Sequence, residues 1–245
     1  MRFSDRVVLV TGAAGGIGLA AALRFAAEGA KLVLVDRDAG ALPAASAAVR
    51  ERGHGDALEV VCDVGAEDQV AHAVGQALGQ FGRLDVVVNN AGLMIFKPIA
   101  ELTAADWTKV LQVDLLGAFF FIKQAFLHMQ PGGAIVNVSS VHALETEPHV
   151  APYAAAKAAL LSLTRSAALE GVGKVIRVNA VVPGAIDTPM LWNNPQVQSG
   201  AEHIDPGEVG KPGELAAAIA FLASDEADFI QGAALVVDGG RLCRL

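Results

Sequence analysis

The 245-residue sequence predicts an α/β fold in which a doubly wound parallel sheet is covered by helices on both faces. Apolar runs of strand length alternate with helical patterns from one end of the chain to the other. Apolar residues make up 53% of the chain and charged residues 18%, which suits a sheet buried on both faces. A glycine-rich turn follows the first apolar run. Residues 1–245 fit a single domain, since doubly wound folds of this length do not need to split.

The glycine-rich turn, residues 11–18, joins a predicted strand at 7–10 to a predicted helix. Gly12 permits a tight turn, Gly16 lets backbone N–H groups approach a pyrophosphate, and Gly18 lets the helix lie against the strand. The helix N-terminus then faces the phosphate charge. Taken alone, the stretch could also be an ordinary turn.

The next strand, 31–35, ends at Asp36, about 20 residues beyond the turn, where a carboxylate can bind the ribose of a dinucleotide. A solvated strand end is the alternative interpretation of Asp36. A helix at 43–52 and a strand at 58–62, which closes on Asp63, follow.

A helix at 67–81 leads into a strand at 84–88, which runs directly into Asn89-Asn90-Ala91-Gly92. Two amides and a glycine at the carboxyl edge of an open sheet are typical of a ligand site.

The following helix begins after Thr103, a predicted N-cap, and continues through 111–129 with Asp114 among apolar neighbours. A strand at 134–138 then ends in Ser139-Ser140. The helix at 153–169 is apolar on nearly all sides and is therefore predicted to form an oligomer interface. The remaining elements are a strand at 175–182 that leaves through Pro183-Gly184, a mobile lid without clear periodicity at 188–212, a helix at 214–222 and a strand at 234–237.

Tyr153 and Lys157 lie four residues apart at the start of a helix, so both side chains point from one face. A phenol with a pKa of about 10 is a poor base, but a fixed ammonium favours the phenolate. Ser140 can donate a hydrogen bond to a substrate oxygen while Tyr153 moves a proton. A turn serine, a packing tyrosine and a surface lysine are the alternatives, which their joint placement disfavours.

Several classes of function are disfavoured by composition. A net charge of −8 opposes nucleic-acid binding. Cys62 and Cys243 match no metal-ligand spacing, so no metal site is expected. Cys62 ends an apolar strand and is predicted to be a core thiol, which favours a reducing compartment. The first strand begins too early to leave room for a signal peptide, and the longest apolar run, 115–122, is too short to span a bilayer. A soluble, cytoplasmic protein without a membrane partner is expected.

Four ordered motifs give the chain a specific resemblance. They are Thr-Gly-x-x-x-Gly-x-Gly at 11–18, Asn-Asn-Ala-Gly at 89–92, Tyr-x-x-x-Lys at 153–157 with Ser140 thirteen residues before the tyrosine, and Pro183-Gly184 followed by Thr188. On these motifs the chain resembles a single-domain short-chain dehydrogenase/reductase over essentially its whole length. The resemblance implies a Rossmann-type sheet of about seven parallel strands and a homo-oligomer, a dimer or tetramer, that uses the helices beginning near Leu115 and Tyr153.

The resemblance also implies a dinucleotide site. The residues it assigns to that site are Gly12, Gly15, Gly16, Ile17, Gly18, Asp36, Arg37, Asp63, Val64, Asn90, Ala91, Gly92, Tyr153, Lys157, Pro183, Gly184, Ile186 and Thr188. NAD is the expected cofactor, because Asp36 would repel the 2′-phosphate of NADP. Arg37 could pair with that phosphate, but its neighbour Asp38 weakens this escape.

The implied catalytic residues are Ser140, Tyr153, Lys157 and Asp114. Tyr153 is the acid/base, Ser140 holds the substrate oxygen, and Lys157 binds the nicotinamide ribose while lowering the tyrosine pKa. Asp114 departs from the family, which usually has an asparagine there that supports a proton relay through its main-chain carbonyl. Aspartate keeps that carbonyl and adds a charge.

The implied reaction transfers a hydride between a secondary alcohol and the nicotinamide, giving a ketone or lactone. A sugar, a polyol or a small cyclic alcohol would suit the expected pocket, drawn from Met94, Phe96, Ser140, His142, Leu144, Tyr153, Met190 and Trp192, of which Met94, Ser140, His142 and Trp192 are the expected substrate contacts. A β-ketoacyl thioester reductase-like activity and a catalytically silent dinucleotide sensor remain alternatives.

Overall fold

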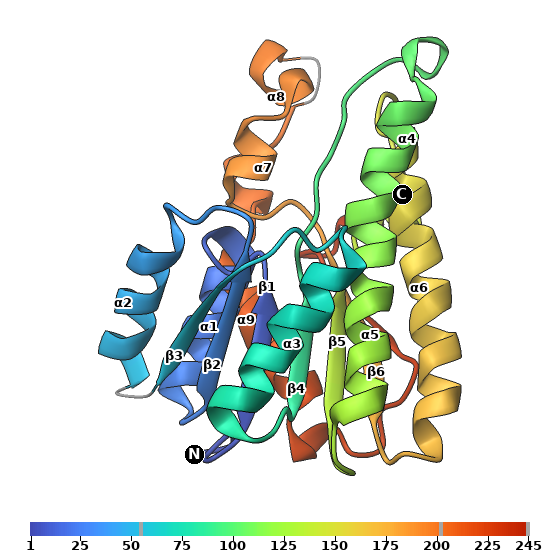
Figure 1. Cartoon of the computed structure of the whole chain (residues 1–245). Coiled ribbons are helices and arrows are strands. Elements are labelled where there is room, and N and C mark those ends of the chain that lie inside the picture. Colours follow the sequence, from blue (N-terminus) through green and yellow to red (C-terminus); the bar gives the residue numbers. More distant parts are fainter. Residues whose placement is uncertain (54–55, 201–202, 244–245) are drawn as a thin grey trace.

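The computed structural model describes residues 1–53, 56–200 and 203–243, and its centre is one seven-stranded parallel sheet (Figure 1). The strand order is β3-β2-β1-β4-β5-β6-β7, so the direction of winding reverses between β1 and β4. The predicted doubly wound sheet is confirmed. The strands are β1 (Val7–Thr11), β2 (Lys31–Asp36), β3 (Ala57–Val61), β4 (Val86–Asn89), β5 (Ala134–Val138), β6 (Arg177–Pro183) and β7 (Ala234–Val237).

Each face of the sheet is covered by its own set of helices. On one face α1 (Gly16–Ala27), α2 (Leu42–Gly53) and α9 (Pro212–Ala223) pack against side chains such as Val8 and Val10. On the other face α3 (Glu67–Phe81), α5 (Gly117–His128) and α6 (Ala151–Val172) pack against Val7 and Leu9. Neighbouring residues of a strand point to opposite faces, so a run of apolar residues builds both cores.

The helix predicted to continue through 111–129 is interrupted. It consists of α4 (Ala104–Leu111), a π-helical turn η2 (Gln112–Leu116) and α5. Thr103 is the N-cap, as predicted: its hydroxyl accepts a hydrogen bond from the Asp106 N–H at 3.2 Å, and Asp106 accepts one in return from the Thr103 N–H at 2.9 Å. The π-turn inserts an extra residue per turn and so changes which side chains face the sheet.

Within the described ranges, one helical stretch, Ala104–His128, has the length and apolar composition needed to cross a membrane. This stretch is longer than the apolar run at 115–122, which the sequence analysis judged too short to span a bilayer. Its second half, α5, packs against β4, α3 and α6. These are the contacts of a helix that covers a sheet.

Some predicted boundaries were wrong. β6 starts at Arg177 instead of 175, because Val175 has a left-handed φ of 56° in the turn before it. The segment 188–212 is not irregular throughout: it contains α7 (Pro189–Trp192), α8 (Pro195–Ser199) and the 3₁₀ turn η4 (Pro206–Glu208), while its residues 201–202 lie outside the described chain. Proline begins all three elements, a position it favours. The other 3₁₀ turns are η1 (Ile99–Glu101), η3 (Val141–Ala143), η5 (Asp225–Ala227) and η6 (Arg241–Cys243).

Candidate active site at the carboxyl edge of the sheet

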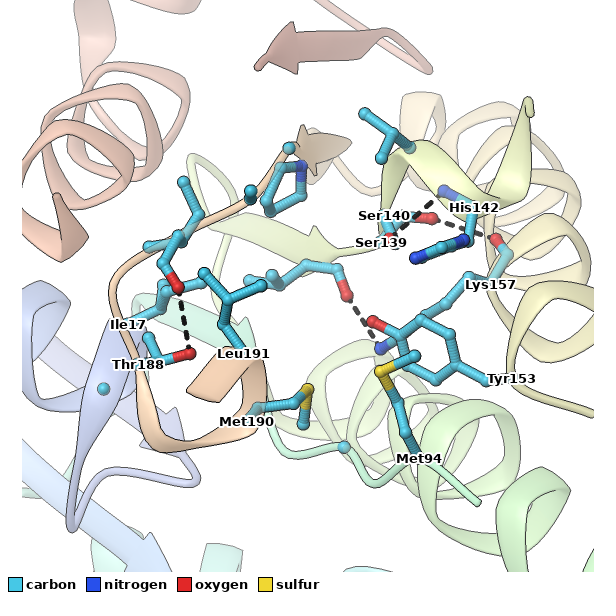
Figure 2. A pocket seen from close by; sticks show the side chains of 18 of the residues that line it. Ile17, Met94, Ser139, Ser140, His142, Tyr153, Lys157, Thr188, Met190 and Leu191 are labelled. Atoms are coloured by element: carbon cyan, nitrogen blue, oxygen red, sulfur yellow. Dashed lines mark hydrogen bonds between the residues drawn. The ribbon is translucent and has the colours of Figure 1, made fainter. Parts of the chain in front are cut away.

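A cleft of about 330 Å³ lies where β1, β4, β5 and β6 end (Figure 2). Figure 2 shows Ser140, His142 and Tyr153 on one side of the cleft and Thr188 and Leu191 on the other. Most residues predicted for the site line it: Gly12, Gly15, Gly16, Ile17, Asn90, Ala91, Gly92, Met94, Ser140, His142, Tyr153, Lys157, Pro183, Gly184, Ile186 and Thr188. Gly18, Asp36, Arg37, Asp63, Val64, Asp114 and Trp192 are not part of its lining.

The glycine turn forms one end of the cleft and is braced from β4. Gly12 has a φ of 64°, in the left-handed region that favours glycine. A Cβ atom on Gly18 would lie 2.1 Å from the Gly12 carbonyl oxygen, so only glycine fits where α1 meets the turn. The Asn90 side chain donates to the Thr11 carbonyl at 2.9 Å, and the Thr11 hydroxyl accepts from the Asn90 N–H at 2.9 Å. Asn90 therefore fixes the turn as well as lining the cleft.

The acidic residue at the end of β2 is tied to the glycine turn. Asp36 accepts a hydrogen bond from the Ala14 N–H at 3.0 Å through one carboxylate oxygen, and from the Asp38 N–H at 3.1 Å through the other. Arg37 is exposed beside it. This carboxylate thus stands next to the turn but outside the lined cleft.

Asp63 and Val64 follow β3 and also lie outside the cleft lining. The Asp63 carboxylate accepts from the Gly65 N–H at 2.9 Å, whereas Val64 is buried. The resemblance assigns both residues to the dinucleotide site, and in this structure they lie beside the cleft and not in its lining.

The other end of the cleft holds three buried polar residues. Tyr153 and Lys157 come from the first two turns of α6, and Ser140 precedes η3. Ser140 and Tyr153 are each 6% exposed and Lys157 is 3% exposed. The Lys157 ammonium donates to the Val138 carbonyl oxygen at 3.1 Å and lies 5.4 Å from the centre of the Tyr153 ring. The lysine and the phenol are thereby fixed relative to the end of β5.

Asp114 lies behind this group and touches Lys157. It is 1% exposed, and its carboxylate oxygen Oδ1 is 3.1 Å from the Lys157 Nζ. The other oxygen, Oδ2, accepts a hydrogen bond from the Leu93 N–H at 3.0 Å. The π-turn η2 places this residue against the lysine and away from the cleft lining.

Burial has the largest effect on the pKa of Tyr153. It raises this pKa above its ordinary value; Lys157 and a hydrogen bond with Ser140 lower it, and Asp114 raises it further. Lys157 thus lowers the pKa of Tyr153, as the resemblance implies, while the net pKa lies above its ordinary value. Burial lowers the pKa of Lys157, but Asp114 and Tyr153 both raise it, and together they leave the net pKa above its ordinary value. Burial also raises the pKa of Asp114, against the opposing effects of Lys157 and the Leu93 N–H.

The substrate side is only partly as predicted. His142 and Met94 line the cleft, and the His142 ring meets the Tyr153 ring edge-on at 5.9 Å. Trp192 does not line it: its indole N–H donates to Asp187 at 2.7 Å. Met190, which lines the cleft, and Trp192 lie two residues apart on α7, so their side chains point in different directions. Phe96 and Leu144, also expected in the pocket, are likewise outside the lining.

Met190 lines the cleft, as predicted for the pocket. Sequence reasoning missed other residues of the lining: Val138, Ser139, Val141, Ala185, Pro189, Leu191, Asn194 and Arg241. Asn194 accepts from the Gln196 N–H at 2.9 Å and caps α8, which the Asn-Pro pair in the sequence could have revealed. Arg241 is brought to the cleft by the turn after β7, and no local pattern points to it. The described residues contain no group of three or more His, Cys, Asp or Glu side chains that could hold a metal ion.

Comparison with known proteins identifies the family to which the chain belongs. A family model described as enoyl-(acyl carrier protein) reductase matches residues 12–241. The chain is 46% identical over 243 residues to cis-4-hydroxycyclohexanecarboxylate dehydrogenase of Sinomonas cyclohexanicum, covering 97% of both chains. It is 40% identical to meso-2,3-butanediol dehydrogenase of Serratia marcescens, covering 98% of this chain and 96% of that one.

A solved structure agrees with these matches. The crystal structure of levodione reductase superimposes with a TM-score of 0.94 at 39% identity, covering 100% of both chains. The sequence and structural matches extend over nearly all of the chain. The chain therefore belongs to the short-chain dehydrogenase/reductase family and is an NAD(P)-dependent oxidoreductase acting on a CH–OH group.

Proposed function

We propose that this protein is an NAD-dependent dehydrogenase of a secondary alcohol carried on a small ring, and that it interconverts this alcohol and the ketone. The observation that carries the proposal is the buried group Ser140, Tyr153 and Lys157, which shares one cleft with the glycine turn. A proton-transfer group and a dinucleotide-binding turn are the two parts that this reaction needs.

The glycine turn fits a dinucleotide. A Cβ atom at Gly18 would collide with the Gly12 carbonyl oxygen and the Asn90 side chain, so α1 can lie close to the turn. The turn precedes the N-terminus of α1, where the helix dipole favours a phosphate. Asp36 supports NAD over NADP, because a 2′-phosphate placed beside its carboxylate would meet a like charge. When bound, the nicotinamide accepts or supplies the hydride.

The protein's own side chains handle the proton. In the oxidising direction Tyr153 takes the proton from the alcohol oxygen, and in the reducing direction it returns it to the carbonyl oxygen. Ser140 donates a hydrogen bond to that oxygen, and Lys157 holds the ribose next to the nicotinamide. Burial restricts all three side chains before the substrate arrives, and Lys157 is also held by its hydrogen bond to Val138 of β5.

A small ring suits the apolar part of the cleft. Met94, Met190 and Leu191 provide an apolar wall, while His142 and Glu147 add polar groups next to the tyrosine. His142 Nε2 lies 3.8 Å from a Glu147 carboxylate oxygen. The name of the relative at 46% identity contains a hydroxylated cyclohexane, which supports a ring alcohol as the first candidate.

The proposal includes self-association, as a dimer or tetramer. The α5 and α6 helices expose large apolar side chains, which are Leu116 just before α5 together with Phe119, Leu127, Leu169 and Val172. Exposed apolar surface of this kind favours burial against another copy. Sedimentation velocity at several protein concentrations tests this. A reducing, cytoplasmic setting is supported by the two free cysteines, of which Cys62 is buried.

The function is tested with initial rates for substituted cyclohexanols, acyclic diols, sugars and polyols, each with NAD and with NADP, and for β-ketoacyl thioester reduction with the reduced cofactors. We expect the highest kcat/KM for a ring alcohol with NAD. Turnover of thioesters alone would favour a β-ketoacyl reductase. Tight dinucleotide binding without any turnover would favour a silent sensor.

A further inference from the structure

The residue that sets this chain apart from the family pattern is also the most deeply buried acid in the described part of the chain. Asp114 lies in the π-turn η2, is 1% exposed and does not line the cleft. Its Oδ2 is fixed by the Leu93 N–H at 3.0 Å, so its Oδ1 is directed at Lys157 Nζ, 3.1 Å away. A buried carboxylate without a cation would be very costly, and Lys157 supplies that cation.

The ammonium group of Lys157 has two fixed contacts. It donates a hydrogen bond to the Val138 carbonyl oxygen at 3.1 Å. It also lies 3.1 Å from Asp114 Oδ1, a buried oxygen that the ammonium pairs with by charge and not by a hydrogen bond of good geometry. Asp114 and Val138 together therefore determine where Lys157 Nζ stands.

The charge of Asp114 also reaches Tyr153. Lys157 alone would favour the phenolate, and a carboxylate 3.1 Å from its ammonium offsets that positive charge. Apolar side chains pack around Tyr153 and lower the local dielectric constant, which strengthens this effect. They are Val110, Leu93, Met94, Ile95, Leu111 and Ala156.

The other titratable groups near Tyr153 come from different elements. His142 of η3 packs edge-on against its ring, with Glu147 behind that histidine, and Arg241 lines the same cleft. The pKa of Tyr153 responds chiefly to burial, Lys157 and Asp114, and the last of these acts in the raising direction.

We propose that Asp114 is a positioning residue that holds Lys157 in a buried ion pair and, through its charge, keeps Tyr153 protonated to a higher pH than Lys157 alone would allow. This inference deepens the proposed function and rests on it. A protonated Tyr153 is the form that donates to a carbonyl oxygen, and the phenolate is the form that accepts from an alcohol. Asp114 thus supports carbonyl reduction over the neutral range and moves alcohol oxidation towards alkaline pH.

The sequence provides a direct test, because Tyr153 is the only tyrosine in the chain. Phenolate formation followed by ultraviolet difference absorbance therefore reports Tyr153 alone, without substrate or cofactor. In Asp114→Asn the midpoint of this titration should fall by about one pH unit, a tenfold rise in the phenolate fraction below the midpoint. An unchanged or raised midpoint would overturn the proposal, since the charge of Asp114 would then have no such effect.

A matched control and a second measurement complete the test. Glu147→Gln makes the same carboxylate-to-amide change on the cleft wall beyond His142, and it should shift the midpoint far less. In wild-type protein the midpoint should lie above the ordinary tyrosine range, and a midpoint below that range contradicts the proposal without any variant. The acid limb of kcat/KM for alcohol oxidation should move to lower pH in Asp114→Asn. If no alcohol is turned over, the proposed function fails while the absorbance titration still tests Asp114.

Discussion

The two ends of the cleft are built differently. At the proposed catalytic end, called the catalytic end below, Tyr153, Lys157 and Asp114 are at most 6% exposed, and α6, β5 and the π-turn hold them in place. At the lid end, Met190 and Trp192 are 41% and 40% exposed on a helix of one turn, α7. In Figure 1 α7 and α8 stand apart from the layers that cover the sheet.

This difference in burial suggests a division of roles, with proton transfer at the buried end and substrate selection at the exposed end. Groups that transfer a proton need a fixed geometry before the substrate arrives, which a buried and hydrogen-bonded network provides. Groups that contact the variable part of a substrate can sit on an exposed segment, since exposed segments tolerate change. We expect substitutions at the catalytic end to change kcat for every substrate, and substitutions at the lid end to change KM and substrate preference.

The largest effect is expected at Tyr153. Positioned acid/base catalysis contributes about 10² to 10⁴ in rate, so Tyr153→Phe should reduce kcat by that factor. The phenyl ring keeps the packing against His142, and NAD affinity should stay within about twofold, measured by calorimetric titration. Residual activity above about a tenth of the wild-type value would remove Tyr153 from the acid/base role.

The next largest effect concerns the choice of cofactor. Asp36 lies beside the glycine turn, where its carboxylate would repel the 2′-phosphate of NADP. We expect NAD to be preferred by about a hundredfold in kcat/KM, which corresponds to a repulsion of about 2.8 kcal/mol, since each 1.4 kcal/mol is about tenfold. Asp36→Ala should remove most of this preference by removing the repulsion. Equal use of both cofactors by the unmodified protein would show that Arg37 neutralises the 2′-phosphate and that Asp36 does not select NAD.

The sequence predicted the sheet, and it predicted that Ser140, Tyr153 and Lys157 lie together, as they do in the cleft. The physical reason is that both predictions rest on local patterns. The alternating apolar runs and the turn at 11–18 predict the strands, the helices and their order along the chain without information from distant residues. Tyr153 and Lys157 share a helix face by spacing alone. Ser140 meets them because consecutive strands of the sheet end at one edge.

What the sequence could not provide depends on contacts between distant residues. The π-turn at Asp114 has no periodic signature, and its ion pair with Lys157 joins positions 43 residues apart. The net direction of the Tyr153 pKa needs the balance between burial and two opposite charges. Trp192 was assigned to the substrate by its apolar character, but the direction of its side chain is set by Asp187.

A smaller effect is expected at Gly92, where a substitution disturbs the catalytic end without replacing a titratable residue. A Cβ atom there would lie 2.7 Å from Asp114 Oδ1 and 3.3 Å from Lys157 Nζ, so Gly92→Ala must displace the ion pair. We expect kcat to fall by about tenfold, since misplacement by about 1 Å can cost about a hundredfold. Steady-state kinetics and the Tyr153 absorbance titration should change together.

Gly75→Ala is the matched control for that variant. Gly75 lies inside α3, and a Cβ atom there meets no other atom within 4 Å. The substitution should leave kcat unchanged and stabilise the protein by up to about 1 kcal/mol in urea unfolding. A Gly92→Ala enzyme with wild-type kcat would show that the ion pair can move without consequence for proton transfer.

The smallest effect is expected at the lid end, at Trp192. Its indole N–H donates to Asp187 in an exposed setting, where a hydrogen bond contributes about 1 kcal/mol, so Trp192→Phe should loosen α7 only slightly. We expect KM to rise by less than about fivefold for ring and acyclic alcohols alike, with kcat unchanged. Met190→Ala provides the comparison, because Met190 lines the cleft from the same helical turn and should change the ratio of kcat/KM values for the two alcohol classes. If Trp192→Phe changes that ratio as well, the indole reaches the substrate during turnover, and the lid closes further than its contacts in this structure indicate.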